Sequence, residues 1–217
     1  MALQIVLASN NAKKLAELRA LLAGLPLAIV AQASLGISEA DEPHHSFVEN
    51  ALAKARHAAR ASGGAAIADD SGLCVAALAG APGVISAHFA GELPPLAGAA
   101  QESREARRQR QDAANNQALL ARLAGVADRR GHFTSTLVAL RHADDPEPLV
   151  AVGRWPGEIL AAPRGEHGFG YDPLVYIPSL GATVAELDAD TKNRHSHRAL
   201  AAAVLRQMLV DAWHLGG

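Results

Sequence analysis

Two adjacent carboxylates, Asp69 and Asp70, directly follow the apolar segment Ala65–Ala68, which is predicted to be a strand. Neighbouring carboxylates repel each other and shift each other's pKa unless a cation or a proton lies between them. Mg²⁺ takes oxygen ligands and usually keeps several waters and substrate phosphates. Because α/β folds bind ligands at strand ends, we expect this pair to belong to a functional site rather than to a plain turn.

A second polar segment, Ser9-Asn10-Asn11-Ala12-Lys13-Lys14, lies between a predicted strand and a predicted helix. Small polar residues at a helix N-terminus can direct backbone N–H groups at a phosphate, and Lys14 adds a full positive charge. The segment is not a Walker A motif, because GxxxxGK[ST] occurs nowhere in the chain. Taken alone, it is also explained by an ordinary capped loop.

The segment Ser46–Ser62 is helical by composition, with Ser46 as a plausible N-cap and Glu49 placed to complete a capping box. Asn50 and Lys54 are four residues apart and share one face of this helix. The helix could present a carboxylate and an ammonium group to one cleft. A solvated helix face is the alternative explanation.

The segment Gly168-Phe169-Gly170-Tyr171-Asp172 places an aromatic residue between two glycines. An exposed phenylalanine can stack on a nucleobase, and Asp, His and Arg side chains can read the edge of the base. Phe169 could instead be a loop anchor, and His197 could simply begin a helix. Residues further along the chain that could take part are Lys192, Ser196, His197 and Arg198.

Other chemistries fit these residues less well. His195 and His197 are two residues apart at a helix start and do not face one another, which argues against a zinc site. Cys74 lies between two apolar residues and is predicted to be buried in the core. Ser71 is not part of a G-x-S-x-G elbow, so a serine hydrolase triad is not expected.

The elements that must position these residues alternate between strands and helices, which predicts an α/β fold. The chain has 217 residues, 49% of them hydrophobic, a net charge of -2 and one cysteine. This composition argues against a basic duplex-binding surface and excludes an intrachain disulfide. Strands are predicted at Gln4–Ala8, Leu27–Ala31, Ala65–Ala68, Gly131–Leu140, Leu149–Trp155 and Pro173–Ile177, and helices at Ala12–Leu22, Ser46–Ser62, 101–124 and Ser196–Trp213.

Taken together, these segments resemble the inosine/xanthosine triphosphate pyrophosphatase family, also called Ham1-like. The resemblance is collinear over nearly the whole chain, and the joint order of the motifs is highly specific although each is weak alone. The motifs are Ser9-x-Asn11-x-x-Lys14, Phe47-x-Glu49-Asn50-Ala51-x-x-Lys54-Ala55, Ala68-Asp69-Asp70-Ser71-Gly72-Leu73, Pro82-Gly83-Val84-x-Ser86-Ala87, Gly168-Phe169-Gly170-Tyr171-Asp172-Pro173, Ala185-Glu186-Leu187 and Lys192-x-x-x-Ser196-His197-Arg198.

The resemblance implies one domain over residues 1–217, with an elongated mixed sheet, flanking helices and two lobes around a central substrate cleft. It implies Mg²⁺-dependent hydrolysis of ITP, dITP and XTP to the monophosphate and pyrophosphate, which removes deaminated purine nucleotides from the precursor pool. It also implies a homodimer that acts on a small nucleotide. The sequence itself predicts a cytoplasmic protein without a nucleic acid polymer or membrane as partner, because it has one cysteine, no signal-peptide core, no apolar run of membrane-spanning length and no strongly basic composition.

Roles are carried over by position from the same resemblance. Asp70, Lys14 and Lys54 are the implied catalytic residues, with Asp70 as the base that activates water. The implied metal ligands are Asp70, Asp41 and Glu42. The implied substrate-binding residues are Ser9, Asn10, Asn11, Ala12, Lys13, Lys14 and Ser71 at the phosphates and Phe169, Gly170, Tyr171, Asp172, Lys192, His197 and Arg198 at the base.

The chain departs from the family pattern at several positions: Ala76, Ile85, His88, Pro43-His44, and Asp41 where the family has a glutamate. These departures bear on loop geometry and on the second metal ligand rather than on the type of reaction. Two alternatives are kept open: a Maf-like nucleotide pyrophosphatase with another base preference, and a nucleotide-binding protein that has lost catalysis.

Overall fold

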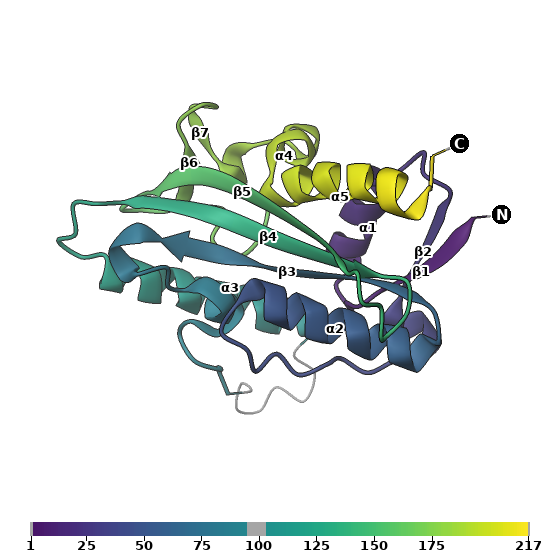
Figure 1. The fold of residues 1–217 in the computed structure, drawn as a ribbon. Helices are drawn as coiled ribbons and strands as arrows, with labels where there is room; N and C mark the ends of the chain where they lie inside the picture. Colours follow the sequence, from purple (N-terminus) through teal and green to yellow (C-terminus); the bar gives the residue numbers. More distant parts are fainter. Residues whose placement is uncertain (1, 95–102, 217) are drawn as a thin grey trace. The chain divides into compact units, whose positions relative to one another are not determined.

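The computed structural model describes residues 2–94 and 103–216 (Figure 1). The helices are α1 (Ala12–Leu21), α2 (Phe47–Ser62), α3 (Arg104–Arg122), α4 (Ala189–His195) and α5 (His197–Trp213). The strands are β1 (Leu3–Leu7), β2 (Leu27–Ala31), β3 (Ala65–Val75), β4 (Arg130–Leu140), β5 (Leu149–Ile159), β6 (Val175–Ile177) and β7 (Ala182–Thr183). None of these helices is long and apolar enough to cross a membrane.

The chain forms two compact units, and it passes from one to the other inside the long strands β3, β4 and β5 and inside helix α4. Over the described residues the strands are hydrogen-bonded in the order β2-β1-β3-β4-β5-β6-β7. β1 pairs in parallel with both β2 and β3, whereas β6 pairs antiparallel with β5 and with β7. This mixed sheet with flanking helices confirms the predicted α/β fold class. The first unit comprises residues 1–71, 134–154 and 193–217, and the second comprises 72–133 and 155–192.

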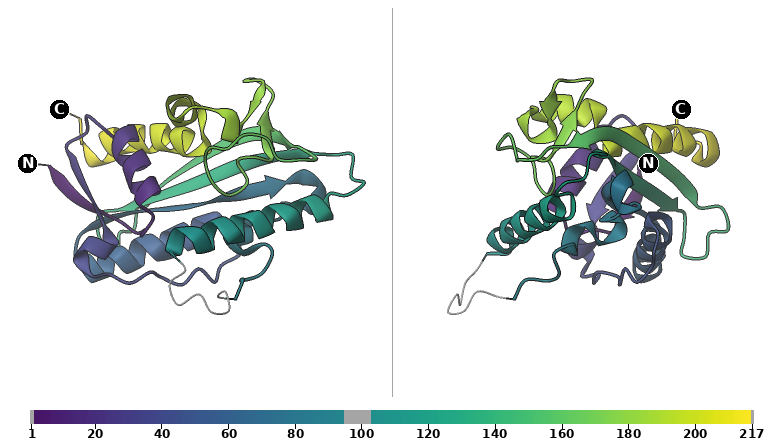
Figure 2. Two further views of the ribbon diagram at one scale, coloured as in Figure 1. Left: turned by 180° about the vertical axis from the view of Figure 1, so that it is seen from behind. Right: turned by 90° about the vertical axis from the view of Figure 1, so that its left-hand side faces the viewer.

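Alternating side chains on the strands build two apolar layers in the first unit. Ile5 and Leu7 of β1 face one layer, where they pack with buried residues of α1 and α5. Val6 and Ala8 face the other layer and pack against the alanine face of α2. Because successive strand side chains point to opposite faces, one strand serves both layers. The views in Figures 1 and 2 show α2 and α5 on opposite faces of the strands.

The second unit has its own core, to which α3 contributes Leu119 and Leu123. These leucines pack with residues from the far ends of β3 and β5 and with Tyr171 and Leu174 from the loop before β6. The predicted helix at 101–124 is therefore present as α3, although its first two predicted residues lie outside the described part of the chain. This core gives the glycine-rich loop around Phe169 a rigid support.

Two strand predictions were too short. β3 continues through Asp69 and Asp70 to Val75 instead of ending at Ala68, and β5 continues past Trp155 to Ile159. Charged residues are rare inside strands, but both aspartates of β3 have cationic partners supplied by other elements. The carboxylate pair therefore lies within a strand rather than in a turn after one.

Gly153 of β5 lies where α5 packs directly on the strand. A Cβ atom at this position would overlap the backbone of His197 and of Ala201. We therefore expect Gly153→Ala to lower the free energy of unfolding by about 3 kcal/mol, measured by urea denaturation, because overpacking displaces backbone. Gly64→Ala is the matched control, since Gly64 has open space around it and no left-handed φ. Equal stability of the two variants would contradict this account of the α5 contact.

Candidate functional site

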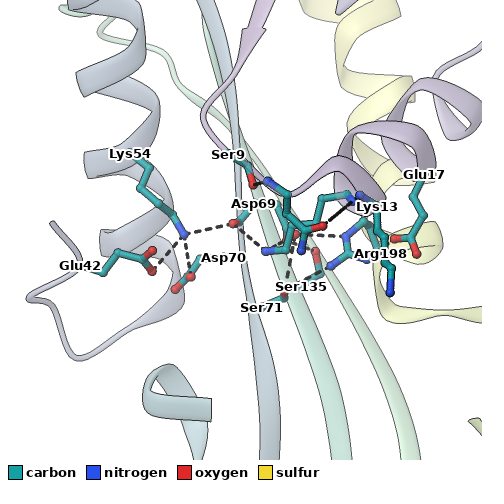
Figure 3. A network of polar contacts seen from close by, with 12 residues as sticks. Ser9, Lys13, Glu17, Glu42, Lys54, Asp69, Asp70, Ser71, Ser135 and Arg198 are labelled. Carbon is teal, nitrogen blue, oxygen red and sulfur yellow. Dashed lines mark hydrogen bonds and ion pairs between the residues drawn. The ribbon is translucent and has the colours of Figure 1, made fainter. Parts of the chain in front are cut away.

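Asp69 of β3 anchors two cations in the first unit (Figure 3). Its Oδ2 atom lies 2.9 Å from Nζ of Lys14 and 3.1 Å from Nε of Arg198. Its Oδ1 atom accepts a hydrogen bond of 2.8 Å from Ser135 of β4. Both carboxylate oxygens are thus engaged, and the residue is only 3% exposed. Asp69 therefore holds Lys14 and Arg198 in fixed positions.

Asp70, the next residue, takes part in a separate charge cluster with α2 and the segment before it. Nζ of Lys54 lies 2.8 Å from Oδ1 of Asp70 and 3.0 Å from Oε2 of Glu42, and it also donates to the carbonyl oxygen of Asp69. Asn50, on the same helix face as Lys54, holds the preceding segment through the backbone of His44. The shared face of Asn50 and Lys54 is therefore buried against this cluster, and is not a solvated helix face.

The two adjacent aspartates have opposite pKa shifts. Burial by itself would raise the pKa of Asp69, but the positive charges of Lys14 and Arg198 hold it well below its usual range. Burial raises the pKa of Asp70 to about 6, with Lys54 opposing the shift and Glu42 adding to it. Two carboxyl groups whose pKa values are driven apart are suited to different tasks, with Asp69 as a fixed anion and Asp70 as a proton acceptor near neutral pH.

Lys54 stays charged although it is buried. Desolvation by itself would lower the pKa of its ammonium group, but the carboxylates of Asp70 and Glu42 raise it above its ordinary value. A single cation thus balances two carboxylates, and the cluster keeps an excess of negative charge.

The chemistry of this cluster fits a divalent cation that prefers oxygen ligands. Oδ2 of Asp70 is buried and has no hydrogen-bond partner among the described residues. Glu42 brings a second, half-exposed carboxylate. Within the described part of the chain no group of three or more His, Cys, Asp or Glu could hold a metal ion. Two carboxylates agree with Mg²⁺, which proteins bind through one or two carboxylates together with substrate phosphates.

The predicted phosphate loop is capped by its own side chains. Oδ1 of Asn11 accepts hydrogen bonds from the backbone N–H groups of Lys13 and Lys14, and Oγ of Ser9 accepts one from Asn11. The capped-loop explanation therefore describes the local geometry correctly. The same geometry places Lys14 on Asp69, so the loop and the β3 carboxylates belong to one site.

A second group of predicted residues gathers in the second unit. Oδ2 of Asp172 accepts a hydrogen bond from the backbone N–H of Phe169 and pairs with Nζ of Lys192 at 2.7 Å. Nζ of Lys192 also lies 4.5 Å from the centroid of the Phe169 ring. Gly168 has a φ of +82°, and a Cβ there would overlap the Asp172 carboxylate. The glycine thus permits the loop to close on Asp172.

Some predicted residues have surroundings that the sequence did not suggest. Arg198 contacts Asp69, Glu17 and Ser71 in the first unit and so belongs with the phosphate-loop residues. The hydroxyl of Tyr171 is buried and donates to the Ser86 carbonyl, which is an anchoring role. The remaining predicted residues are placed as follows: Asp41 is exposed beside Glu42, Asn10 is half-buried before α1, Lys13 and Ala12 are exposed at the start of α1, and His197 is buried at the start of α5.

Sequence reasoning missed Ser135 and Glu17. Ser135 lies in a β-branched strand, where a serine gives no functional signal. Glu17 follows Lys14 by three residues on α1, and this spacing could have indicated that both reach the same site.

This chain is similar over nearly its whole length to known proteins of one family. A model of the Ham1 family matches residues 5–208. The dITP/XTP pyrophosphatase of Methylibium petroleiphilum is 65% identical over 97% of this chain and 99% of its own length, and that of Burkholderia pseudomallei is 58% identical over 93% and 91%. A solved HAM1 protein from Coxiella burnetii is 41% identical with a TM-score of 0.85, covering 96% of this chain and 99% of its own. The Ham1 protein of Staphylococcus aureus is 35% identical with a TM-score of 0.79, covering 95% and 97%. The resemblance deduced from the motifs is thereby confirmed.

Proposed function

Because this chain belongs to the Ham1 family, we propose that it hydrolyses dITP, XTP and ITP to the corresponding monophosphate and pyrophosphate. Relatives that are more than half identical over nearly their whole length are dITP/XTP pyrophosphatases. The observation in the structure that carries the proposal is the pairing of Lys54 with Asp70 and Glu42, beside Lys14 on Asp69. One unit thus contains two lysine side chains that can bind a polyphosphate. It also contains a carboxyl group that can accept a proton.

In the proposed reaction, water attacks the α-phosphorus and the bond to the bridging oxygen of pyrophosphate breaks. Asp70 takes a proton from the water, and without a bound cation burial raises its pKa to about 6, which favours this role. Lys14 and Lys54 stabilise the negative charge that grows on the leaving pyrophosphate. Asp69 and Ser135 keep Lys14 and Arg198 oriented before substrate arrives, which lowers the reorganisation that the reaction requires.

Asp70 and Glu42 are the residues that we propose to hold Mg²⁺. When bound, the ion supplies charge neutralisation at the phosphates and lowers the pKa of a coordinated water. Asp69 is not assigned as a ligand, since its oxygens are bonded to Lys14, Arg198 and Ser135. Asp41 is exposed and, unlike Glu42, has no ion pair with Lys54, so we assign this role to Glu42 rather than to Asp41.

We assign base recognition to Phe169, Asp172 and Lys192. The phenylalanine ring offers a stacking surface, and the ammonium of Lys192 beside it can donate to a 6-oxo group. Adenine carries an amino group there, so a donor would lose its partner, at about 1–3 kcal/mol. Guanine also has a 6-oxo group, so its exclusion depends on its 2-amino group.

The test is pyrophosphate release from dITP, XTP, ITP, ATP and GTP, each with and without Mg²⁺. We expect Mg²⁺-dependent release from the first three, with ATP and GTP slower by about 10²-fold or more. Equal rates with all five would contradict the assigned base recognition. Release only from nucleotides with other bases would favour the Maf-like alternative, and no release from any nucleotide would favour a binding protein.

The homodimeric state stays a prediction from the family resemblance, and the cytoplasmic location and the absence of nucleic acid or membrane partners stay predictions from the sequence. Size-exclusion chromatography with light scattering would test the dimer. The single-domain prediction for residues 1–217 is supported by a family model that spans both compact units.

A further inference from the structure

Helix α3 holds the loop that carries Phe169 through two side chains spaced one turn apart. Oδ2 of Asp112 accepts a hydrogen bond of 2.8 Å from the backbone N–H of Gly170. Nδ2 of Asn116 donates a hydrogen bond of 3.0 Å to the carbonyl oxygen of the same residue. Residues four apart lie on one face of a helix, so one face of α3 binds both the N–H and the carbonyl group of Gly170.

The two hydrogen bonds restrain the backbone of Gly170, which is a glycine of this loop next to Phe169 and so has great conformational freedom. It has a φ of +61° and separates Phe169 from Tyr171, whose buried hydroxyl is already anchored. Glycine has the greatest backbone freedom of any residue, so without external bonds the Phe169 side of the loop could adopt many orientations. Two side-chain bonds at Gly170 remove that freedom at this residue, and they add to the bonds that already join Phe169 to Asp172.

A third residue of the same helix face approaches the ring itself. The guanidinium of Arg108, one turn before Asp112, lies 4.7 Å from the centroid of Phe169. A cation at this distance is attracted to the face of an aromatic ring. Arg108, Asp112 and Asn116 thus form a stripe on α3 directed at the loop, and no motif of the family resemblance includes this stripe.

We propose that Asp112 and Asn116 are positioning residues for base recognition. By fixing the backbone of Gly170 they set the direction of the Phe169 ring and of the Asp172 carboxylate bonded to the Phe169 N–H. They act through the loop and not on the reacting phosphates. This inference rests on the proposed function, because it takes Phe169 as the surface on which the base stacks.

The test compares steady-state kinetics with dITP for Asp112→Ala, Asp112→Asn and Asn116→Ala. We expect each alanine variant to raise KM by about tenfold, the effect of one lost hydrogen bond, with kcat within about twofold of the wild type. Asp112→Asn should restore most of the loss, because its amide oxygen can still accept from Gly170. Gln117→Ala, an exposed neighbour on α3, is the matched control and should leave KM unchanged.

Amide hydrogen exchange of the segment 166–173 in nucleotide-free protein measures how strongly α3 restrains the loop, and this measurement does not depend on enzymatic activity. Faster exchange in Asp112→Ala than in Gln117→Ala is expected. Unchanged exchange, or an unchanged KM in a folded alanine variant, would overturn the proposal. So would a fall in kcat that tracks a lower melting temperature, since this is what a purely structural role gives. A wild-type protein that releases no pyrophosphate would overturn the proposed function. Faster exchange in Asp112→Ala would then still show that α3 restrains the loop.

Discussion

Replacing Asp70 with alanine is expected to reduce pyrophosphate release from dITP by about 10³-fold or more, because a general base contributes about 10²–10⁴-fold. The same substitution removes one of the two carboxylates assigned to Mg²⁺, so raising the Mg²⁺ concentration should not restore the rate. Initial rates across a range of Mg²⁺ concentrations would measure both effects. Substantial turnover by a folded Asp70→Ala protein would end the assignment of Asp70 as the base.

The stability of the Asp70 variants separates a functional carboxylate from a structural one. Burial raises the pKa of Asp70 to about 6, so the folded state disfavours its charged form. In Mg²⁺-free buffer the contribution of this group to stability should therefore decrease as the pH rises from about 4 to about 6. Asp70→Asn should remove that decrease and keep or raise the melting temperature at pH 7. A loss in the free energy of unfolding as large as that expected for removing Lys54, about 3 kcal/mol, would instead show that the Asp70 charge serves mainly to hold Lys54.

A control for metal binding lies in the same segment. Glu42→Gln is expected to raise the Mg²⁺ concentration that gives half-maximal rate, because Glu42 is one of the two carboxylates assigned to the ion. Asp41→Asn should have little effect, since Asp41 is exposed next to it. The opposite ranking would show that Asp41 keeps the role that its position in the family implies.

The second large effect is expected for Lys54→Met. This change removes the cation shared by Asp70 and Glu42 and should lower kcat by about 10²-fold, as for the loss of one charge-stabilising donor. Breaking a buried ion pair leaves an uncompensated charge, so the free energy of unfolding should fall by about 3 kcal/mol. Kinetics with dITP and urea denaturation measure the two effects.

Lys54→Arg and Arg56→Met are the matched variants for that experiment. Arg56 lies two residues further along α2 with an exposed side chain, so its replacement should change neither activity nor stability. Lys54→Arg keeps the charge and should retain most of the stability, but the larger planar group should still reduce kcat. If Lys54→Met and Arg56→Met behaved alike, the charge cluster would have no role in catalysis.

The positions of several elements could be predicted from short apolar runs for the strands and from helix-favouring composition for the helices. The strands at β1 and β2 and the helices at α1, α2 and α5 agree with the predictions to within one or two residues. The end of β3 could not be predicted, because consecutive aspartates are unfavourable in a strand unless partners from elsewhere neutralise them. Those partners are Lys14 of α1 for Asp69 and Lys54 of α2 for Asp70, and both belong to other elements than β3.

The sequence by itself determined the family, the residue types of the site and the reaction class, because the order of several short motifs is specific even though each motif is not. Only the tertiary structure decided how the charges are shared. It assigned Asp69 to Lys14 and Arg198, Asp70 to Lys54, and Gly170 to side chains of α3. Such pairings join residues from separate elements, and the pKa of a carboxyl group depends on burial and on neighbouring charges within a few ångströms. Neither quantity is encoded in local spacing, so the division of roles between adjacent aspartates follows from the folded chain alone.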